Sequence, residues 1–210
     1  MPRAQELSFR RNILLTDRLS SAFTYAERLH RSQTRKGNDI PYVAHLMAVC
    51  ATVLEWGGDE DVAIAALLHD AAEDQGGIKT LTAIRTRFGD RVADIVEACS
   101  DSITADKAVK APWQARKEAT VKKLRTVNRD VALVTAADKL HNLTALVRDV
   151  RRDGAETMKR FNAAPDKVVW YHAAVAEALI AHRDSAPVDE INEANAELAA
   201  MLGLPAQADG

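Results

Sequence analysis

The hydrophobic and polar positions along the chain follow a helical rather than an alternating pattern. Ala, Leu, Glu, Arg and Lys fill the periodic segments, and Gly and Pro fall between them. These residues favour helices, whereas strands would show alternating β-branched and aromatic positions. The sequence contains no internal repeat and no convincing strand pattern. It therefore predicts an all-α protein, a single-domain bundle of about 8–11 helices.

Start and stop signals place the expected helices. Asp17 can cap the first helix, Pro41 suits the first turn of the second, and Gly76, Gly77 and Gly154 break the pattern. We expect helices over 17–31, 41–57, 59–74, 80–89, 90–99, 113–127, 129–151, 155–162, 167–182 and 188–202. The corresponding domain division is an N-terminal extension over 1–17, a main domain over 18–184, and a C-terminal helix and tail over 185–210.

Composition narrows the partners and the compartment. With 28 Lys and Arg against 30 Asp and Glu, the formal charge of −2 attracts neither a nucleic acid polymer nor an anionic membrane. Cys50 and Cys99 lie in apolar helical patterns, as buried free cysteines of a reducing compartment do. No segment has the about 20 apolar residues that span a bilayer. We expect a cytoplasmic protein, and helix 188–202 could pack on its own chain or form a homo-oligomer.

The most informative segment is the polar end of an apolar helix. Residues 62–68 are apolar on every side of a helix, so this helix should be buried. It leads directly into His69 and Asp70, and then into Glu73 and Asp74. Such groups are costly in an apolar environment unless they are paired or bind a metal. A solvated helix end is the alternative, although negative charge there opposes the helix dipole.

His45 and Asp138 extend this group. His45 lies in the apolar segment 42–49, and Asp138 follows the apolar run 131–137. Taken singly, the first suggests a core histidine and the second a surface carboxylate. Together with His69 and Asp70 they offer two imidazoles and two carboxylates from three helices, which suits a divalent transition metal. The mixed nitrogen and oxygen set favours Mn²⁺ or Fe²⁺ over a thiolate-bound structural zinc.

These residues carry a family resemblance. His45, the pair His69-Asp70, and Asp138 match the H…HD…D signature of HD-domain phosphohydrolases. The segments 35–37, 41–45, 65–74, 88–89 and 137–142 are similar to the hydrolase domain of RelA/SpoT-type proteins and to stand-alone small alarmone hydrolases, including the metazoan SpoT homologue. The resemblance covers roughly 19–182. An HD pair alone is weak evidence, but the full run HDxxED with its flanking motifs is specific.

The resemblance implies a reaction and a metal. Members of this family remove pyrophosphate from the 3′ position of guanosine tetra- or pentaphosphate, ppGpp or pppGpp. By resemblance, one Mn²⁺ is held by His45, His69, Asp70 and Asp138. Glu73 and Asp74 then position or deprotonate the attacking water, which is the role expected of carboxylates beside a metal.

The resemblance also implies a substrate site. Arg35 and Lys36 would contact phosphate or base, and Asn142 the ribose side. Arg160 and Tyr171 lie in segments that resemble those closing the nucleotide pocket in stand-alone members. For His141 we expect packing or support of a ligand rather than metal binding.

Several alternatives stay open. Thr144 and Ala145 depart from the family pattern, which leaves guanosine and adenosine substrates, such as pApp, undecided. Within the segment 103–117 phosphate contacts or a solvated basic face could be made by Lys107, Lys110, Arg116 and Lys117. The alternative functions are a metal-dependent phosphatase of NADPH or another nucleotide, and a non-catalytic nucleotide-binding HD domain.

Overall fold

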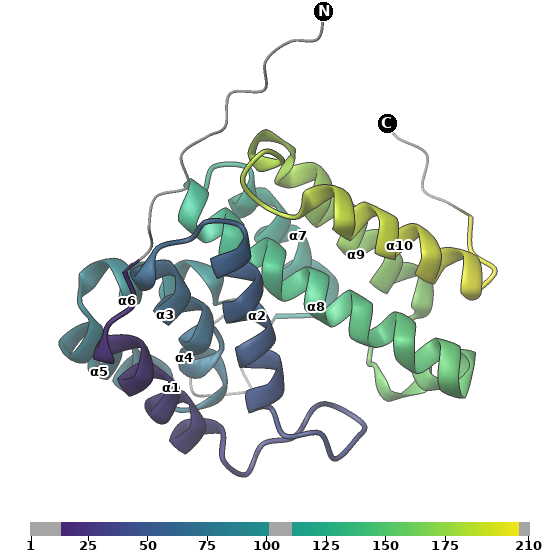
Figure 1. The fold of residues 1–210 in the computed structure, drawn as a ribbon. Helices are drawn as coiled ribbons and strands as arrows, with labels where there is room; N and C mark the ends of the chain where they lie inside the picture. Colours follow the sequence, from purple (N-terminus) through teal and green to yellow (C-terminus); the bar gives the residue numbers. More distant parts are fainter. Residues whose placement is uncertain (1–13, 101–110, 206–210) are drawn as a thin grey trace, which may run out of the picture.

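The computed structural model describes residues 14–100 and 111–205, and within them the protein is helical (Figure 1). Ten α-helices and two short 3₁₀ helices occur there, and the described residues contain no strand beyond one isolated bridge between Thr34 and Pro41. The predicted all-α class is therefore confirmed. Lys107 and Lys110 lie outside the described residues.

The helices follow one another with short connections. Their bounds are α1 (Asp17–His30), α2 (Val43–Glu55), α3 (Glu60–Leu68), α4 (Ala71–Asp74), α5 (Gly77–Phe88), α6 (Asp90–Cys99), α7 (Trp113–Leu124), α8 (Arg129–Asp153), η2 (Ala155–Arg160), α9 (Pro165–Ala178), η3 (Ile180–His182) and α10 (Val188–Met201).

Side-chain caps fix the starts of the helices that frame the site. Asp59 Oδ1 accepts the Val62 amide at 3.2 Å at the start of α3, and Asn128 Oδ1 accepts the Val131 amide at 3.0 Å at the start of α8. Each cap satisfies an amide that has no partner inside its helix. At α1 the cap is Thr16 rather than the expected Asp17.

The core forms where α2, α3 and α8 meet. Residues 62–68 of α3 are all buried, as their pattern predicted, and so are residues 131–138 of α8. Figure 1 shows α1 to α6 on one side of α8 and α9 and α10 on the other, with α10 packed along α8 and α9. Among the described residues, every helix is too short or too polar to cross a bilayer.

The expected helix over 59–74 is interrupted at its polar end. Helix α3 ends at Leu68 and α4 begins at Ala71, so His69 and Asp70 form a turn between them. Asp70 has φ −95° and ψ −5°, a conformation between helix and turn that redirects the chain. Helix α5 begins at Gly77 rather than at the expected Thr80. Gly76 precedes it with φ +122°, a value that only glycine adopts readily.

Candidate active site

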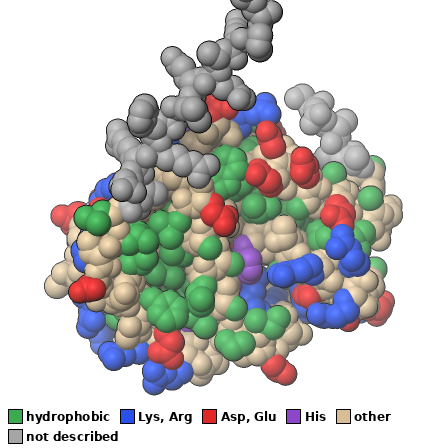
Figure 2. Space-filling model, in the orientation of Figure 1, with side chains coloured by type: hydrophobic (Ala, Val, Ile, Leu, Met, Phe, Trp, Pro, Cys, Tyr) green, Lys and Arg blue, Asp and Glu red, His purple; other side chains and the backbone are tan. Residues whose placement is uncertain are grey.

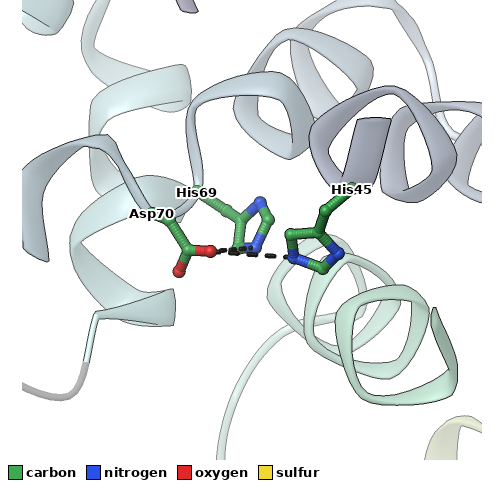
Figure 3. A group of neighbouring side chains, drawn as sticks. All are labelled: His45, His69 and Asp70. Carbon is green, nitrogen blue, oxygen red and sulfur yellow. Dashed lines mark ion pairs between the residues drawn. The ribbon is translucent and has the colours of Figure 1, made fainter. Parts of the chain in front are cut away.

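Two helices and one turn bring the histidines and a carboxylate together. His45 comes from α2, and His69 and Asp70 come from the turn between α3 and α4 (Figure 3). One ligand atom from each of the three lies within 4.8 Å of the others, which is close enough to share a metal ion. His45 and His69 are buried, and Asp70 is half-buried. The three side chains point toward one another from separate backbone segments.

Asp138 approaches the same point from α8. Its Oδ1 lies 3.2 Å from His45 Nε2 and 3.6 Å from His69 Nε2. Asp70 Oδ2 lies 3.7 Å and 3.0 Å from the same two nitrogens. The structure therefore brings together all four side chains that the sequence nominated as metal ligands.

The hydrogen bonds of His69 test whether this group fits a metal. Its Nδ1 lies 2.7 Å from the Ala66 carbonyl, which can only accept, so Nδ1 carries the proton. Its Nε2 is buried and has no hydrogen bond among the described residues. In the neutral ring the free lone pair of Nε2 thus faces the two carboxylates. A buried nitrogen oriented in this way, with two imidazoles and two carboxylates, fits a divalent transition metal.

His45 is oriented by a second histidine. Its Nδ1 lies 2.7 Å from Nδ1 of His141, while its Nε2 faces Asp70 and Asp138. Burial, followed by the charge of His45, lowers the pKa of His141 to about 4. His141 is therefore neutral at physiological pH and can accept the proton that His45 donates from Nδ1. This contact fits the expectation that His141 supports a ligand.

The carboxylates of the centre are ionised and held by donors. Burial would raise the pKa of Asp70 and of Asp138, but the neighbouring imidazoles, and Lys139 beside Asp138, lower both pKa values well below the ordinary range. The Tyr42 hydroxyl donates to Asp70 Oδ2 at 2.5 Å. Lys139 Nζ lies 2.5 Å from Asp138 Oδ2. Two fixed negative charges beside two imidazoles favour a cation between them.

Glu73 and Asp74 lie on α4, and both line the wall of a large cavity next to the histidine pair. Burial and the charge of Asp70 raise the pKa of Asp74, and a hydrogen bond of 2.7 Å from Gln33 Nε2 to Asp74 Oδ2 opposes this shift. A carboxylate with a raised pKa is better suited to take up and release a proton.

The cavity has a volume of about 950 Å³, at the upper end of the range for small-molecule sites. His45, Glu73 and Asp74 line it at the metal centre, and cations line much of the remaining wall. These cations are Arg35, Lys36, Arg116, Lys117, Lys139, Arg148, Arg152 and Arg160. On the face in Figure 2 a histidine is visible near the centre, with Lys and Arg side chains gathered beside it. Such a wall suits a ligand with several negative charges.

A chain of hydrogen bonds links this wall to the metal centre. Arg35 Nη2 donates to Asn142 Oδ1 at 2.7 Å, and Asn142 Nδ2 donates to Asp138 Oδ1 at 2.5 Å. Both residues were expected to contact substrate, and both line the cavity. Lys36 also lines it, with its Nζ 5.6 Å from the ring centre of Phe161.

Tyr171 and Arg160 lie on the far wall. Tyr171 is 5% exposed, and its hydroxyl has no hydrogen-bond partner among the described residues. The Nζ atoms of Lys117 and Lys139 lie 4.8 Å and 5.9 Å from its ring centre. Arg160 donates from Nη2 to Asp149 Oδ2 at 2.5 Å, so part of its guanidinium is already engaged.

The two residues that depart from the family pattern differ in position. Thr144 turns its hydroxyl onto its own helix, where it donates to the Leu140 carbonyl at 2.9 Å. Ala145 lines the cavity, and its methyl group offers no hydrogen bond. This part of the wall therefore lacks a side-chain donor or acceptor that could read a base edge.

Gln33 and Tyr42 were not among the residues selected from the sequence. Each contacts a carboxylate of the site through a long-range hydrogen bond. Their only sequence signal is position, since they flank the segment that contains Arg35 and Lys36.

The fold and the site define a helical protein with a buried centre of histidines and carboxylates that can hold a divalent metal. The family model described as "HD domain" matches residues 22–163, and the chain belongs to that family.

Within the family the chain is similar to alarmone enzymes. It is 35% identical over 145 residues to a GTP pyrophosphokinase of Streptomyces coelicolor, a match covering 68% of this chain and 16% of that protein. It is 33% identical over 165 residues to the bifunctional (p)ppGpp synthase/hydrolase SpoT of Escherichia coli, covering 74% of this chain and 22% of SpoT. The predicted resemblance to RelA/SpoT-type proteins is confirmed. The chain spans less than a quarter of the length of either relative.

A solved structure matches over nearly its whole length. It is described as "A metazoan ortholog of SpoT hydrolyzes ppGpp and plays a role in starvation responses". The TM-score is 0.67 at 26% identity, and the match covers 91% of this chain and 99% of that one.

Proposed function

We propose that the protein is a Mn²⁺-dependent 3′-pyrophosphohydrolase of alarmone nucleotides, acting on ppGpp, pppGpp or adenosine analogues such as pApp. The observation that carries the proposal is the cavity itself. Its inner end has two imidazoles and several carboxylates, and its walls are lined by cations. The names of the E. coli and metazoan relatives support the same reaction.

In this proposal the metal is held by His45, His69, Asp70 and Asp138. Nitrogen and oxygen donors without thiolates favour Mn²⁺ or Fe²⁺ over structural zinc. When bound, the metal lowers the pKa of a water molecule and offsets phosphate charge. His141 and Tyr42 hold His45 and Asp70 in place through the hydrogen bonds described above.

The water that attacks the 3′ diphosphate must lose a proton. Glu73 and Asp74 line the cavity beside the histidine pair and are the carboxylates that accept it. The water oxygen bonds to the phosphorus nearest the ribose, and the bond from that phosphorus to the 3′ oxygen breaks. The 3′ oxygen takes up a proton, so the products are pyrophosphate and a nucleotide with a free 3′ hydroxyl.

Substrate binding falls to the cationic wall. Arg35 and Lys36 contact phosphate, Asn142 contacts the ribose, and Tyr171 offers its buried phenol and ring from the far side. Arg160 adds positive charge while it is paired to Asp149. Because Ala145 cannot hydrogen-bond to a base, we propose weak discrimination between guanine and adenine.

The test is a product assay with purified protein and Mn²⁺. The panel is ppGpp, pppGpp, pApp and NADPH, with pyrophosphate and orthophosphate measured separately. Pyrophosphate from any 3′-diphosphate nucleotide supports the proposal. Orthophosphate from NADPH alone would instead indicate a phosphatase, and metal binding without turnover of the panel would indicate a non-catalytic domain. His69→Ala, which should lose both metal and activity, controls for contaminating phosphatases.

A further inference from the structure

Gln33 lies where the chain leaves α1 and enters the segment that contains Arg35 and Lys36. Its amide nitrogen donates to the His30 carbonyl at 2.9 Å, and its own carbonyl accepts the Tyr42 amide at 2.9 Å. A further bond of 2.8 Å from the Arg35 amide to the Ile40 carbonyl closes the loop between them. The backbone of Gln33 is therefore fixed on both sides at the base of this loop.

The side chain of Gln33 is fixed as well. Its Oε1 accepts from Gln75 Nε2 at 2.6 Å and faces His30 Nδ1 at 2.7 Å, while its Nε2 donates to Asp74 Oδ2 at 2.7 Å. A flipped amide would place its carbonyl against the Asp74 carboxylate and its NH₂ group against a donor. The surroundings therefore allow one orientation, with the donor toward Asp74.

The same segment holds a second carboxylate of the site. His30 is 2% exposed and stacks on Tyr42, with the ring centres 5.3 Å apart and the planes 17° apart. The Tyr42 hydroxyl donates to Asp70. Gln33 and Tyr42 thus hold Asp74 and Asp70 respectively, and His30 contacts both of them.

We propose that Gln33 is a positioning residue for the hydrolytic step, acting through Asp74. The inference rests on the proposed function, in which Asp74 helps to accept the proton of the attacking water. A donor fixed on Oδ2 leaves Oδ1 as the acceptor for that water and sets its direction. It also favours the ionised carboxylate, because an amide N–H stabilises negative charge.

The kinetic test compares three variants with the wild type. Gln33→Leu removes the donor, and Gln33→Glu keeps the shape but places a carboxylate against Asp74. Both should lower kcat about tenfold to a hundredfold, with KM within about threefold and Mn²⁺ content unchanged. Gln75→Leu, which removes only one bond to Gln33, should cost less. Ser32→Ala, an exposed neighbour on the same segment, is the matched control.

Other results would overturn the inference. A purely structural role would lower the folded fraction or raise KM through the Arg35 loop, while kcat per folded molecule stayed the same. Crystal structures of the wild type and Gln33→Leu give a readout that needs no substrate. The Asp74 carboxylate should rotate or lose its single orientation in the variant, and an unchanged Asp74 refutes the positioning role. If the wild type hydrolyses no alarmone, the proposed function fails, but these structures still decide the role of Gln33.

Discussion

Nδ1 of His141 lies 2.7 Å from Nδ1 of His45, and the opposite nitrogen of His45 faces the carboxylates of the candidate metal centre. His141 follows Asp138 by less than one helical turn on α8, so one helix supplies both a candidate ligand and the support for another. Hydrogen-bonded partners of ligand histidines fix the ring orientation and the tautomer. This relationship gives His141 a function that its sequence motif alone does not define.

His141→Ala should weaken Mn²⁺ binding about tenfold to a hundredfold, because His45 would lose the acceptor that orients it. Isothermal titration with Mn²⁺ on the metal-free protein measures the change. His141→Asn is the matched control, since its Oδ1 can accept from His45 near the position of the lost nitrogen, and it should recover part of the affinity. Equal affinity in His141→Ala and the wild type would show that His45 needs no such support.

Glu73 and Asp138 should separate rate from metal binding. Glu73→Gln removes a proton acceptor next to the histidine pair and should keep the metal while losing at least about a hundredfold in kcat. Asp138→Ala removes a buried carboxylate that lies 3.2 Å from His45 Nε2 and should lose both metal and activity. Metal analysis and turnover of the same preparations give the comparison. Equal metal loss in both variants would place Glu73 among the ligands.

A glycine pair isolates the contact between the Arg35 loop and η2. Gly37 has φ +81°, and a Cβ there would lie 2.5 Å from Arg160 Cδ, whereas Gly57 has φ +77° and nothing within 4 Å of such a Cβ. Gly57→Ala should cost only the backbone strain, about 1–2 kcal/mol of unfolding free energy. Gly37→Ala should cost about 1 kcal/mol more, because Arg160 must shift from its ion pair with Asp149. Urea unfolding measures both, and equal losses would mean that Arg160 yields freely.

The sequence predicted the parts of this protein that depend on local pattern. The apolar run 62–68 is buried as expected, and Gly76 ends its helical segment as expected. The break at His69 and Asp70 was missed because both residues keep right-handed backbone angles and no glycine or proline marks the turn. A change in ψ at a single residue leaves no trace in hydrophobic periodicity.

The site shows the same division. His45, His69 and Asp138 were selected because each is a polar residue in an apolar helix, and burial makes such residues expensive without a partner. Gln33 was missed because it is half-buried beside polar neighbours, where a glutamine needs no explanation. Its bond to Asp74 joins residues 41 positions apart, and only the packed structure reveals it.

His172 should make the stability of the protein fall in acid. It is buried on α9, and burial lowers its pKa to about 4, although its Nδ1 lies 2.9 Å from the Val168 carbonyl. Between about pH 6.5, the ordinary histidine pKa, and pH 4, the unfolded chain binds a proton that the folded chain does not. The contribution of His172 is therefore complete above pH 6.5 and is lost as the pH falls toward 4, by about 3 kcal/mol. His172→Asn, whose amide can still donate to Val168, should lose less stability over this range than the wild type. Urea unfolding at pH 7 and pH 4.5, with chelator present, measures the difference, and His182→Asn controls for the loss of a histidine elsewhere. Parallel losses in the wild type and His172→Asn would show that His172 is protonated without strain in the folded protein.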